Sequence, residues 1–230
     1  MSRILAIEAA TEACSVALII GDEVRERFEI APRRHVALLL PFVETLLAEA
    51  GTGLTQLDAI AFGRGPGSFT GLRIAAGMTQ GMAFGADLPV IPVSTLAALA
   101  QGAVHEQGGT QVLAALDARM QEVYWGAFIA DSDGLVQAQG EERVCVPAQV
   151  DVPQPGDWIG TGSGWDTYGE VLAARCALAE PAIRYNRQPH AADVARLAAG
   201  MFAQGGALPP EQAIPVYLRD NVADKPKPRA

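Results

Sequence analysis

An arrangement of apolar segments and carboxylates occurs twice in this chain, about 110 residues apart, and it narrows the choice of fold. In the first copy, the apolar residues 4–7 lead directly into Glu8. Residues 15–20 and 24–30 follow as two strand-like segments joined by a Gly-Asp turn, which is typical of a β-hairpin. The first copy therefore predicts a strand that ends in a carboxylate and is followed by a hairpin.

The second copy repeats this order in the middle of the chain. Residues 111–116 are apolar and end at Asp117. After a short loop, residues 123–129 and 135–144 are separated by the turn sequence DSDG. We interpret the two copies as an internal duplication, with one carboxylate at the same place in each half.

Helical and strand-like segments alternate after the first copy. Residues 35–50 and 72–84 have helical patterns, and residues 59–62 and 90–93 read as strands. Three strands followed by alternating helices and strands, in duplicate, is the plan of the actin-like, sugar-kinase and Hsp70 ATPase fold, which is ribonuclease H-like. We therefore predict an α/β protein built from two small domains.

The same pattern suggests where the domains divide. We assign residues 1–100 to an N-terminal domain and residues 101–210 to a smaller C-terminal domain that includes a predicted helix at 190–203. Residues 211–230 form a C-terminal segment. Its end, DKPKPRA, is too polar and rich in proline to pack, so we predict a mobile basic tail that carries Lys225, Lys227 and Arg229.

Charge and composition exclude several functional classes. A net charge of -9 argues against a protein that binds nucleic acid unaided, because such binding depends on Lys and Arg. No apolar run approaches membrane-spanning length, so we expect a cytoplasmic protein without a membrane role. The three cysteines, Cys14, Cys145 and Cys176, are far apart, and we interpret them as free thiols.

The sequence GRGPGSFTGLRIAAG, residues 63–77, could be a phosphate-binding loop or the start of a helix. A Walker loop needs a lysine, and no lysine occurs before residue 225. The dinucleotide-binding fingerprint is only partly matched, because Thr70 stands where its third glycine belongs. We therefore interpret the loop as a helix start.

The helix that follows this loop indicates a protein partner. Gly77, Gly81 and Gly85 recur every four residues and form a ridge on one face, where a second backbone can approach closely. The preceding helix has an apolar stripe wider than one sheet contact needs. We expect a partner protein to cover these helices. The alternative is that both helices lie inside one compact domain.

The residues expected at this contact lie on both helices. The sequence does not decide which face of the second helix meets the partner, the glycine face or the opposite face around Leu72. Arg73 in the first helical turn opposes the helix dipole and needs an anion, either on this chain or on a partner. The predicted partner-binding set is Leu38, Phe42, Leu72, Arg73, Ala75, Ala76, Gly77, Thr79 and Gly81.

Five sequence stretches resemble the TsaB family, the actin-like partners of TsaD in making threonylcarbamoyladenosine in bacterial tRNA. They are LAIEAATEACSVAL, RRHVALLLPFVETLL, GRGPGSFTGLRIAAGMTQGMAFGADLPVIPVSTLAALA, LDARMQEVYWGAF and PVYLR. The GPGSFTGLR run together with DARxxEVY is specific. The resemblance is loose between residues 144 and 213.

The resemblance also implies that a metal site has been lost. TsaD is similar to this chain but carries an HxxxH pair that binds its catalytic metal. In the corresponding stretch, PVSTLAAL, Thr95 and Leu99 stand where those histidines would lie. Neither side chain offers an imidazole ligand, so we expect no metal site and no cofactor.

The strand-end carboxylates leave one catalytic alternative open. Glu8, Thr11 and Asp117 match the positions where actin-like kinases hold metal and phosphate, and we interpret them as a vestigial nucleotide cleft. Paired carboxylates across a cleft could still be catalytic. The alternative function is therefore an actin-fold ATPase or small-molecule kinase that uses Glu8 and Asp117.

The family resemblance implies a scaffold role. The chain would be a non-catalytic subunit required, with TsaD and the ATPase TsaE, for threonylcarbamoylation of N6 of adenosine 37 in tRNAs that read codons beginning with A. It would form a heterodimer with TsaD and contact tRNA only through the complex. Alone, it could form a homodimer through the same helices.

Overall fold

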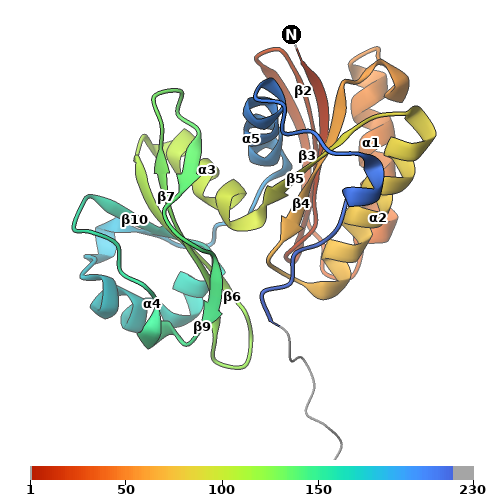
Figure 1. The fold of residues 1–230 in the computed structure, drawn as a ribbon. Coiled ribbons are helices and arrows are strands. Elements are labelled where there is room, and N and C mark those ends of the chain that lie inside the picture. The colour runs from red at the N-terminus through yellow and green to blue at the C-terminus, as the bar shows by residue number, and fades with distance from the viewer. Residues whose placement is uncertain (1, 220–230) are drawn as a thin grey trace, which may run out of the picture.

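The computed structural model describes residues 2–219, which form two lobes that each contain one sheet (Figure 1). The first sheet has the order β3-β2-β1-β4-β5. β1 pairs antiparallel with β2 and parallel with β4, so the N-terminal strand lies at the centre. The strands of this sheet are β1 (Arg3–Glu8), β2 (Ala13–Ile20), β3 (Glu23–Ile30), β4 (Ala59–Gly65) and β5 (Val90–Ser94).

The second sheet repeats this plan with fewer regular strands. Its order is β11-β10-β6-β7-β8, and β9 pairs with β7 outside this path. β6 pairs antiparallel with β7 and parallel with β10, as β1 does with β2 and β4. The strands are β6 (Gln111–Asp117), β7 (Val123–Ala130), β8 (Val136–Ala138), β9 (Arg143–Cys145), β10 (Trp158–Thr161) and β11 (Ile183–Arg184).

Five α-helices cover the faces of the two sheets (Figure 1). α1 and α2 pack on one face of the first sheet and α5 packs on the other. α3 lies between α5 and the second sheet, and α4 covers the far face of that sheet. The helices are α1 (His35–Glu49), α2 (Phe69–Ala86), α3 (Thr95–Gln107), α4 (Ser163–Cys176) and α5 (Ala191–Ala203); short 3-10 turns occur at Leu54–Gln56, Pro147–Gln149, Glu180–Ala182 and Pro210–Gln212.

The duplicated α/β fold predicted from the sequence is confirmed. Both strand–carboxylate–hairpin copies form, with Glu8 at the end of β1 and Asp117 at the end of β6. The returning segment of the second copy is divided into β8 and β9, which pair with opposite ends of β7. α3 was not predicted, although Ser94 caps it by accepting a hydrogen bond from the amide of Ala97 at 3.1 Å.

The predicted division at residues 100 and 210 is wrong for the last helix. α5 follows the second sheet in the chain, but it packs against β1 and β2 of the first sheet. The amide of Ala191 donates to Ser15 Oγ at 2.9 Å, which fixes the start of α5 on β2. The chain therefore crosses back to the first lobe at residues 185–190.

The C-terminal segment joins the lobes a second time. Leu208 pairs with Val90, and the amide of Val216 donates to the carbonyl of Arg64 at 2.7 Å. The C-terminal segment therefore packs along the first lobe. Arg219 then reaches the second lobe, where it bonds to the carbonyl of Ala118 at 2.8 Å. The predicted mobile tail with Lys225, Lys227 and Arg229 lies outside the described residues. None of the helices described in residues 2–219 is both apolar and long enough to span a bilayer.

Candidate functional site

The outer face of α1 and α2 is apolar and uncovered. On α1, Val36 is 71% exposed and Leu40 is 48% exposed, and on α2, Phe84 is 59% exposed. Between such side chains, a Cβ built at Gly77, Gly81 or Gly85 would meet no atom within 4 Å. We call this surface, formed by Val36, Leu40, Gly77, Gly81, Phe84 and Gly85 with the half-buried Leu38 and Phe42 beside it, the helix face.

Four of the predicted partner-binding residues belong to the core instead. Ala75 and Ala76 pack against the first sheet, and Leu72 and Thr79 are also buried on the inner side of α2. Their side chains cannot reach a partner while α2 is seated on its sheet. We therefore remove Leu72, Ala75, Ala76 and Thr79 from the predicted partner-binding set. The residues that remain in it are Leu38, Phe42, Arg73, Gly77 and Gly81. Contact of the remaining residues with a partner stays a prediction.

Arg73 is exposed at the start of α2, and within residues 2–219 no carboxylate forms an ion pair with it. Its guanidinium carbon lies 3.9 Å from the centre of the Phe69 ring, and its Nε donates to the hydroxyl of Tyr217 at 3.2 Å. Cation–π contact thus offsets part of the charge in place of the expected anion. These side chains border a groove of about 310 Å³ between α2, β7 and the C-terminal segment.

The elbow before α2 is a helix start that also closes the β1–β2 loop. The hydroxyl of Ser68 accepts a hydrogen bond from the amide of Gly71, and the amide of Ser68 donates to the carbonyl of Ala10 at 2.7 Å. A Cβ at Gly67 would lie 2.4 Å from the carbonyl oxygen of Ala10. The elbow backbone therefore packs directly against the β1–β2 loop.

Glu8 is buried at the end of β1, with 1% of its surface exposed. Its Oε1 accepts from the amide of Ala10 at 2.7 Å, and its Oε2 accepts from the hydroxyl of Thr95 at 3.3 Å. Gly63 lies directly against this carboxyl, since a Cβ there would be 2.0 Å from Oε2. Burial raises the pKa of Glu8 to about 7, so the carboxyl is largely protonated below neutral pH.

Thr95 and Leu99, the two positions that the family resemblance aligns with histidines of TsaD, have structural contacts. Thr95 bonds to Glu8, and Leu99 is buried in the core cluster between the lobes. A Cβ at Gly162, the residue before α4, would lie 2.4 Å from Leu99 Cδ2, so the leucine fills the space beside this turn. Within the described chain, no three His, Cys, Asp or Glu side chains are grouped as metal ligands.

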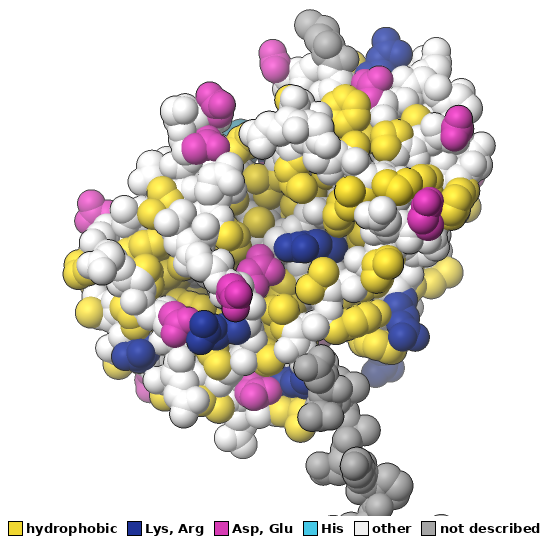
Figure 2. Space-filling model, in the orientation of Figure 1, with side chains coloured by type: hydrophobic (Ala, Val, Ile, Leu, Met, Phe, Trp, Pro, Cys, Tyr) yellow, Lys and Arg dark blue, Asp and Glu magenta, His cyan; other side chains and the backbone are white. Residues whose placement is uncertain are grey.

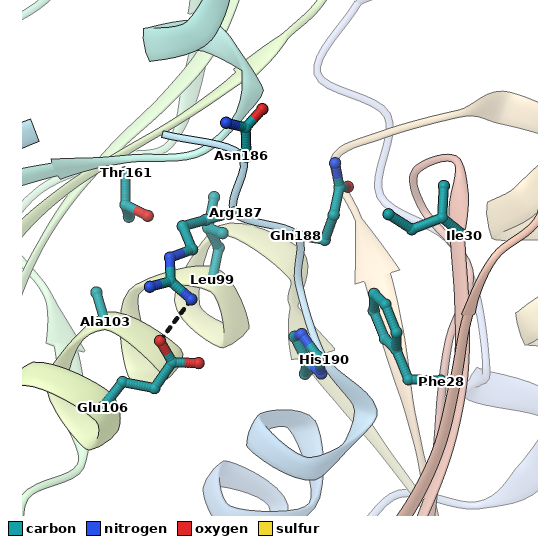
Figure 3. A pocket seen from close by; sticks show the side chains of 11 residues that line it. Phe28, Ile30, Leu99, Ala103, Glu106, Thr161, Asn186, Arg187, Gln188 and His190 are labelled. Carbon is teal, nitrogen blue, oxygen red and sulfur yellow. Dashed lines mark ion pairs between the residues drawn. The ribbon is translucent and has the colours of Figure 1, made fainter. Parts of the chain in front are cut away.

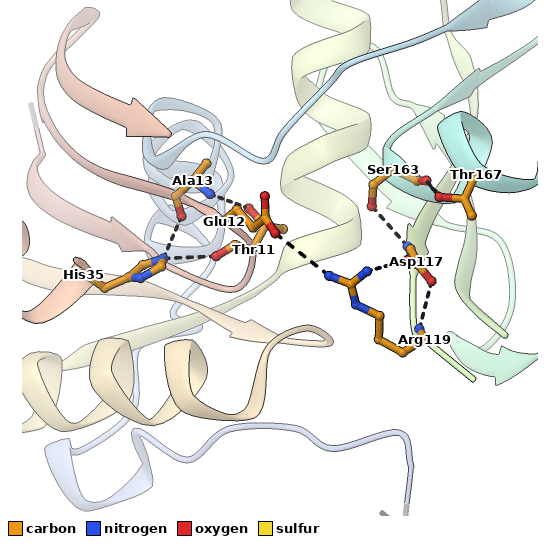
Figure 4. A network of polar contacts seen from close by, with 8 residues as sticks. All are labelled: Thr11, Glu12, Ala13, His35, Asp117, Arg119, Ser163 and Thr167. Carbon is orange, nitrogen blue, oxygen red and sulfur yellow. Dashed lines mark hydrogen bonds and ion pairs between the residues drawn. The ribbon is translucent and has the colours of Figure 1, made fainter. Parts of the chain in front are cut away.

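Asp117 and Thr11 take part in a polar network at the junction of the lobes (Figure 4). The carboxylate of Asp117 accepts from the amide of Arg119 at 2.8 Å and pairs with its guanidinium at 3.2 Å. The same guanidinium lies 3.9 Å from Glu12 Oε1 on the β1–β2 loop. Thr11 Oγ1 accepts from the amide of Ala13, within its own loop. The three predicted cleft residues are thus engaged by the protein itself.

The sequence does not predict that the C-terminal segment packs beside α2, or that apolar residues of α1 are exposed. Figure 2 shows apolar side chains along the junction of the lobes on this face, with basic and acidic ones among them. Tyr217 contacts Phe69, with ring centres 5.2 Å apart, although the two residues are remote in sequence. The sequence shows an apolar stripe along α1. It does not show that Val36 and Leu40 are exposed whereas Leu39 and Val43 are buried.

Replacement of Glu8 by Gln is expected to raise the melting temperature at pH 8 by roughly 5–10 °C. The pKa of Glu8 is about 7 in the folded chain and 4.5 as its ordinary value, so the folded state binds more protons between these pH values. Stability therefore falls as pH rises through this window, by about 3 kcal/mol in total. Gln cannot ionise, and thermal melts of both proteins from pH 5 to 8 would converge at the acidic end. Parallel melting curves across this range would contradict the prediction.

Comparison with known proteins places this chain in a family. Residues 27–227 match the family model described as TsaD: tRNA N6-adenosine threonylcarbamoyltransferase. The "tRNA threonylcarbamoyladenosine biosynthesis protein TsaB" of Escherichia coli is 45% identical over 98% of both chains. The protein of the same name from Haemophilus influenzae is 40% identical over 98% of this chain and 97% of its own.

A solved structure has the same fold. The structure titled "YeaZ from Pseudomonas aeruginosa" superposes with a TM-score of 0.89 and 48% identity, and covers 95% of this chain and 100% of its own. The sequence matches to the E. coli and H. influenzae proteins also cover nearly the whole chain. The chain therefore belongs to the TsaB family.

Proposed function

We propose that this chain is a non-catalytic subunit in the biosynthesis of threonylcarbamoyladenosine in tRNA, acting with TsaD and the ATPase TsaE on N6 of adenosine 37. In this proposal, TsaD carries the metal and the transfer chemistry, and this chain holds TsaD through the helix face. The names of the E. coli and H. influenzae relatives support the pathway. The tRNA is contacted through the complex, in keeping with the net charge of -9.

The observation that carries the proposal is the open glycine ridge of α2. An exposed glycine costs about 0.5–1 kcal/mol relative to alanine in a helix, so three in one helix need a compensating contact. Gly77, Gly81 and Gly85 have no neighbour within 4 Å of a built Cβ, so that contact is not within the described chain. A partner helix packed closely along the ridge supplies the reason, and exposed Val36 and Phe84 supply apolar area beside it. Without TsaD, a second copy of this chain could occupy the same face.

The absence of catalysis is supported by what surrounds the strand-end carboxylates. Glu8 is buried and bonded to Ala10 and Thr95, and Asp117 is paired with Arg119. Both carboxyl groups are therefore already hydrogen-bonded or ion-paired within the chain, in keeping with a structural role. The kinase or ATPase alternative has no comparable support.

The direct test is to mix the purified chain with TsaD and analyse the mixture by size-exclusion chromatography. We expect a complex of one chain with one TsaD, and we expect tRNA modification by TsaD and TsaE to require this chain. Two separate peaks at micromolar concentrations, or full modification without this chain, would overturn the proposal.

The isolated chain is expected neither to hydrolyse ATP nor to bind a divalent metal specifically. Thr95 and Leu99 cannot act as imidazole ligands, and the elbow backbone packs directly against the β1–β2 loop at Ala10. Isothermal titration calorimetry with MgATP, and with Zn²⁺ or Fe²⁺ alone, measures this directly. Stoichiometric micromolar binding would favour the kinase alternative.

A further inference from the structure

A second cavity, of about 160 Å³, lies between the lobes where residues 185–190 cross back to the first lobe (Figure 3). β3, α3, β10 and the crossing segment all contribute to its walls. It is separate from the helix face and from the groove beside Arg73, because it shares no lining residue with either. Neither the family membership nor the proposed scaffold role assigns it a function.

Two buried polar atoms in this cavity lack a hydrogen-bond partner. Thr161 is 1% exposed and lines the cavity, yet its Oγ1 bonds to nothing in the described chain. Gln188 also lines the cavity, and its buried Oε1 is equally unpaired. In Figure 3 the hydroxyl of Thr161 points toward the side where Arg187 lies. Leaving such groups unpaired costs roughly 1–3 kcal/mol each, so the pair indicates a ligand that can donate and accept hydrogen bonds.

A pair of opposite charges borders the same cavity. Arg187 Nη1 lies 2.6 Å from Glu106 Oε2, and both side chains are a little under half exposed. This contact uses one guanidinium nitrogen and one carboxylate oxygen. The remaining guanidinium donors suit a carboxylate, and the second oxygen of Glu106 suits an ammonium group. A zwitterion can therefore bind alongside the ion pair without breaking it.

The size and the other walls restrict the ligand further. A cavity of about 160 Å³ suits a small molecule such as a single amino acid. Leu99 and Ala103 provide apolar wall, and the ring of His190, stacked on Phe28 at 4.2 Å, closes one side.

We infer that this cavity binds a small hydroxylated α-amino acid, whose carboxylate and ammonium contact Arg187 and Glu106 and whose hydroxyl contacts Thr161. Because both lobes and the crossing segment line the cavity, the bound ligand would hold the lobes at a fixed angle. The inference is independent of the scaffold proposal, since binding is measured on this chain alone.

The test is calorimetry of the full chain with L-serine and L-threonine. They are compared with L-alanine, which is L-serine without its hydroxyl, and with L-valine, in which a methyl group replaces the hydroxyl of L-threonine. We expect one molecule per chain, at millimolar concentrations or below, with the hydroxylated amino acids bound about tenfold more tightly. L-serinamide lacks the carboxylate and N-acetyl-L-serine lacks the ammonium, and we expect neither to bind.

Variants assign the contacts to residues. Thr161→Val keeps the shape of the side chain and should remove the preference for L-serine over L-alanine, whereas Glu106→Gln should weaken all amino acids alike by at least tenfold. Thr167→Val is the matched control, because Thr167 lies exposed on α4 and bonds to the carbonyl of Ser163, away from the cavity. Melting curves without ligand establish that each variant is folded.

Three results would overturn the inference. They are no saturable binding of any amino acid up to about 10 mM, equal binding of L-serine and L-serinamide, and a preference for L-serine that survives in folded Thr161→Val. Should Thr161→Val fail to fold, the comparison of L-serine with L-alanine and L-serinamide on the unmodified chain still decides the matter. If no amino acid binds, Thr161 Oγ1 and Gln188 Oε1 are hydrogen-bonded to water only.

Discussion

Replacing Gly81 by Leu is expected to abolish association with TsaD while leaving this chain folded. A leucine here points into open space, because a Cβ at this position has no neighbour within 4 Å. In the complex, the same side chain would stand between two helices that the glycine ridge allows to approach closely. In the free chain, the substitution removes a helical glycine and should raise the melting temperature by about 2–4 °C. Binding and stability are thus expected to change in opposite directions.

The control is Ala174→Leu, which adds similar bulk to an exposed position of α4 in the other lobe. Pull-down or size-exclusion chromatography with TsaD measures association, and thermal melting measures the fold. We expect at least a hundredfold loss of affinity for Gly81→Leu and none for Ala174→Leu. Normal binding of folded Gly81→Leu would mean that TsaD does not use the glycine ridge.

Ala76→Arg, the obvious substitution on the opposite side of α2, cannot serve the same purpose. Ala76 is buried against the first sheet, so an arginine there would place an unpaired charge in the core. Loss of binding by that variant would report unfolding and not the interface. The burial of α2 therefore decides which substitutions are informative, and the sequence alone left this open.

The two-lobed fold could be predicted because the residues that define it are local and repeated. An apolar strand that ends in Glu8 or Asp117 and continues into a hairpin is visible in short windows, as are the helical patterns at 35–50 and 72–84. The structure begins the second of these helices three residues earlier, at Phe69. The return of α5 to the first sheet could not be predicted in this way. It depends on the long-range bond between Ala191 and Ser15, which leaves no local pattern.

The candidate site was predictable only in part, for the same reason. Glycine spacing identified the ridge, but the helical period places Leu72 and Gly77 on different faces without saying which of the faces meets the sheet. The sequence predicts an anion beside Arg73. In the structure, Phe69 contacts Arg73 from one turn earlier on α2, and Tyr217 comes from the C-terminal segment, which meets α2 only in the folded chain. The cavity beside Thr161 requires four separate elements, none of which carries a sequence signal for a ligand.

Gly71→Ala and Gly77→Ala are expected to change stability in opposite directions, although the same substitution is made on one helix. A Cβ at Gly71 would lie 1.9 Å from the carbonyl oxygen of Ala9, so either α2 or the β1–β2 loop must move. We expect a loss of about 3 kcal/mol or more, the upper end for an overpacked core. At Gly77 the added methyl meets nothing, and the higher helix propensity of alanine should contribute about 0.5–1 kcal/mol.

Urea or thermal unfolding of both variants measures this contrast directly, and each is the control for the other. The result also bears on the elbow sequence GRGPGSFTGLRIAAG. If its glycines exist to bring the start of α2 against Ala9 and Ala10, Gly71→Ala must be costly in the isolated chain, where no ligand is present. A neutral Gly71→Ala would imply that the loop moves freely and that the space beside Ala10 can be opened for a phosphate. The kinase alternative would then regain support, because the elbow would no longer hold the β1–β2 loop closed.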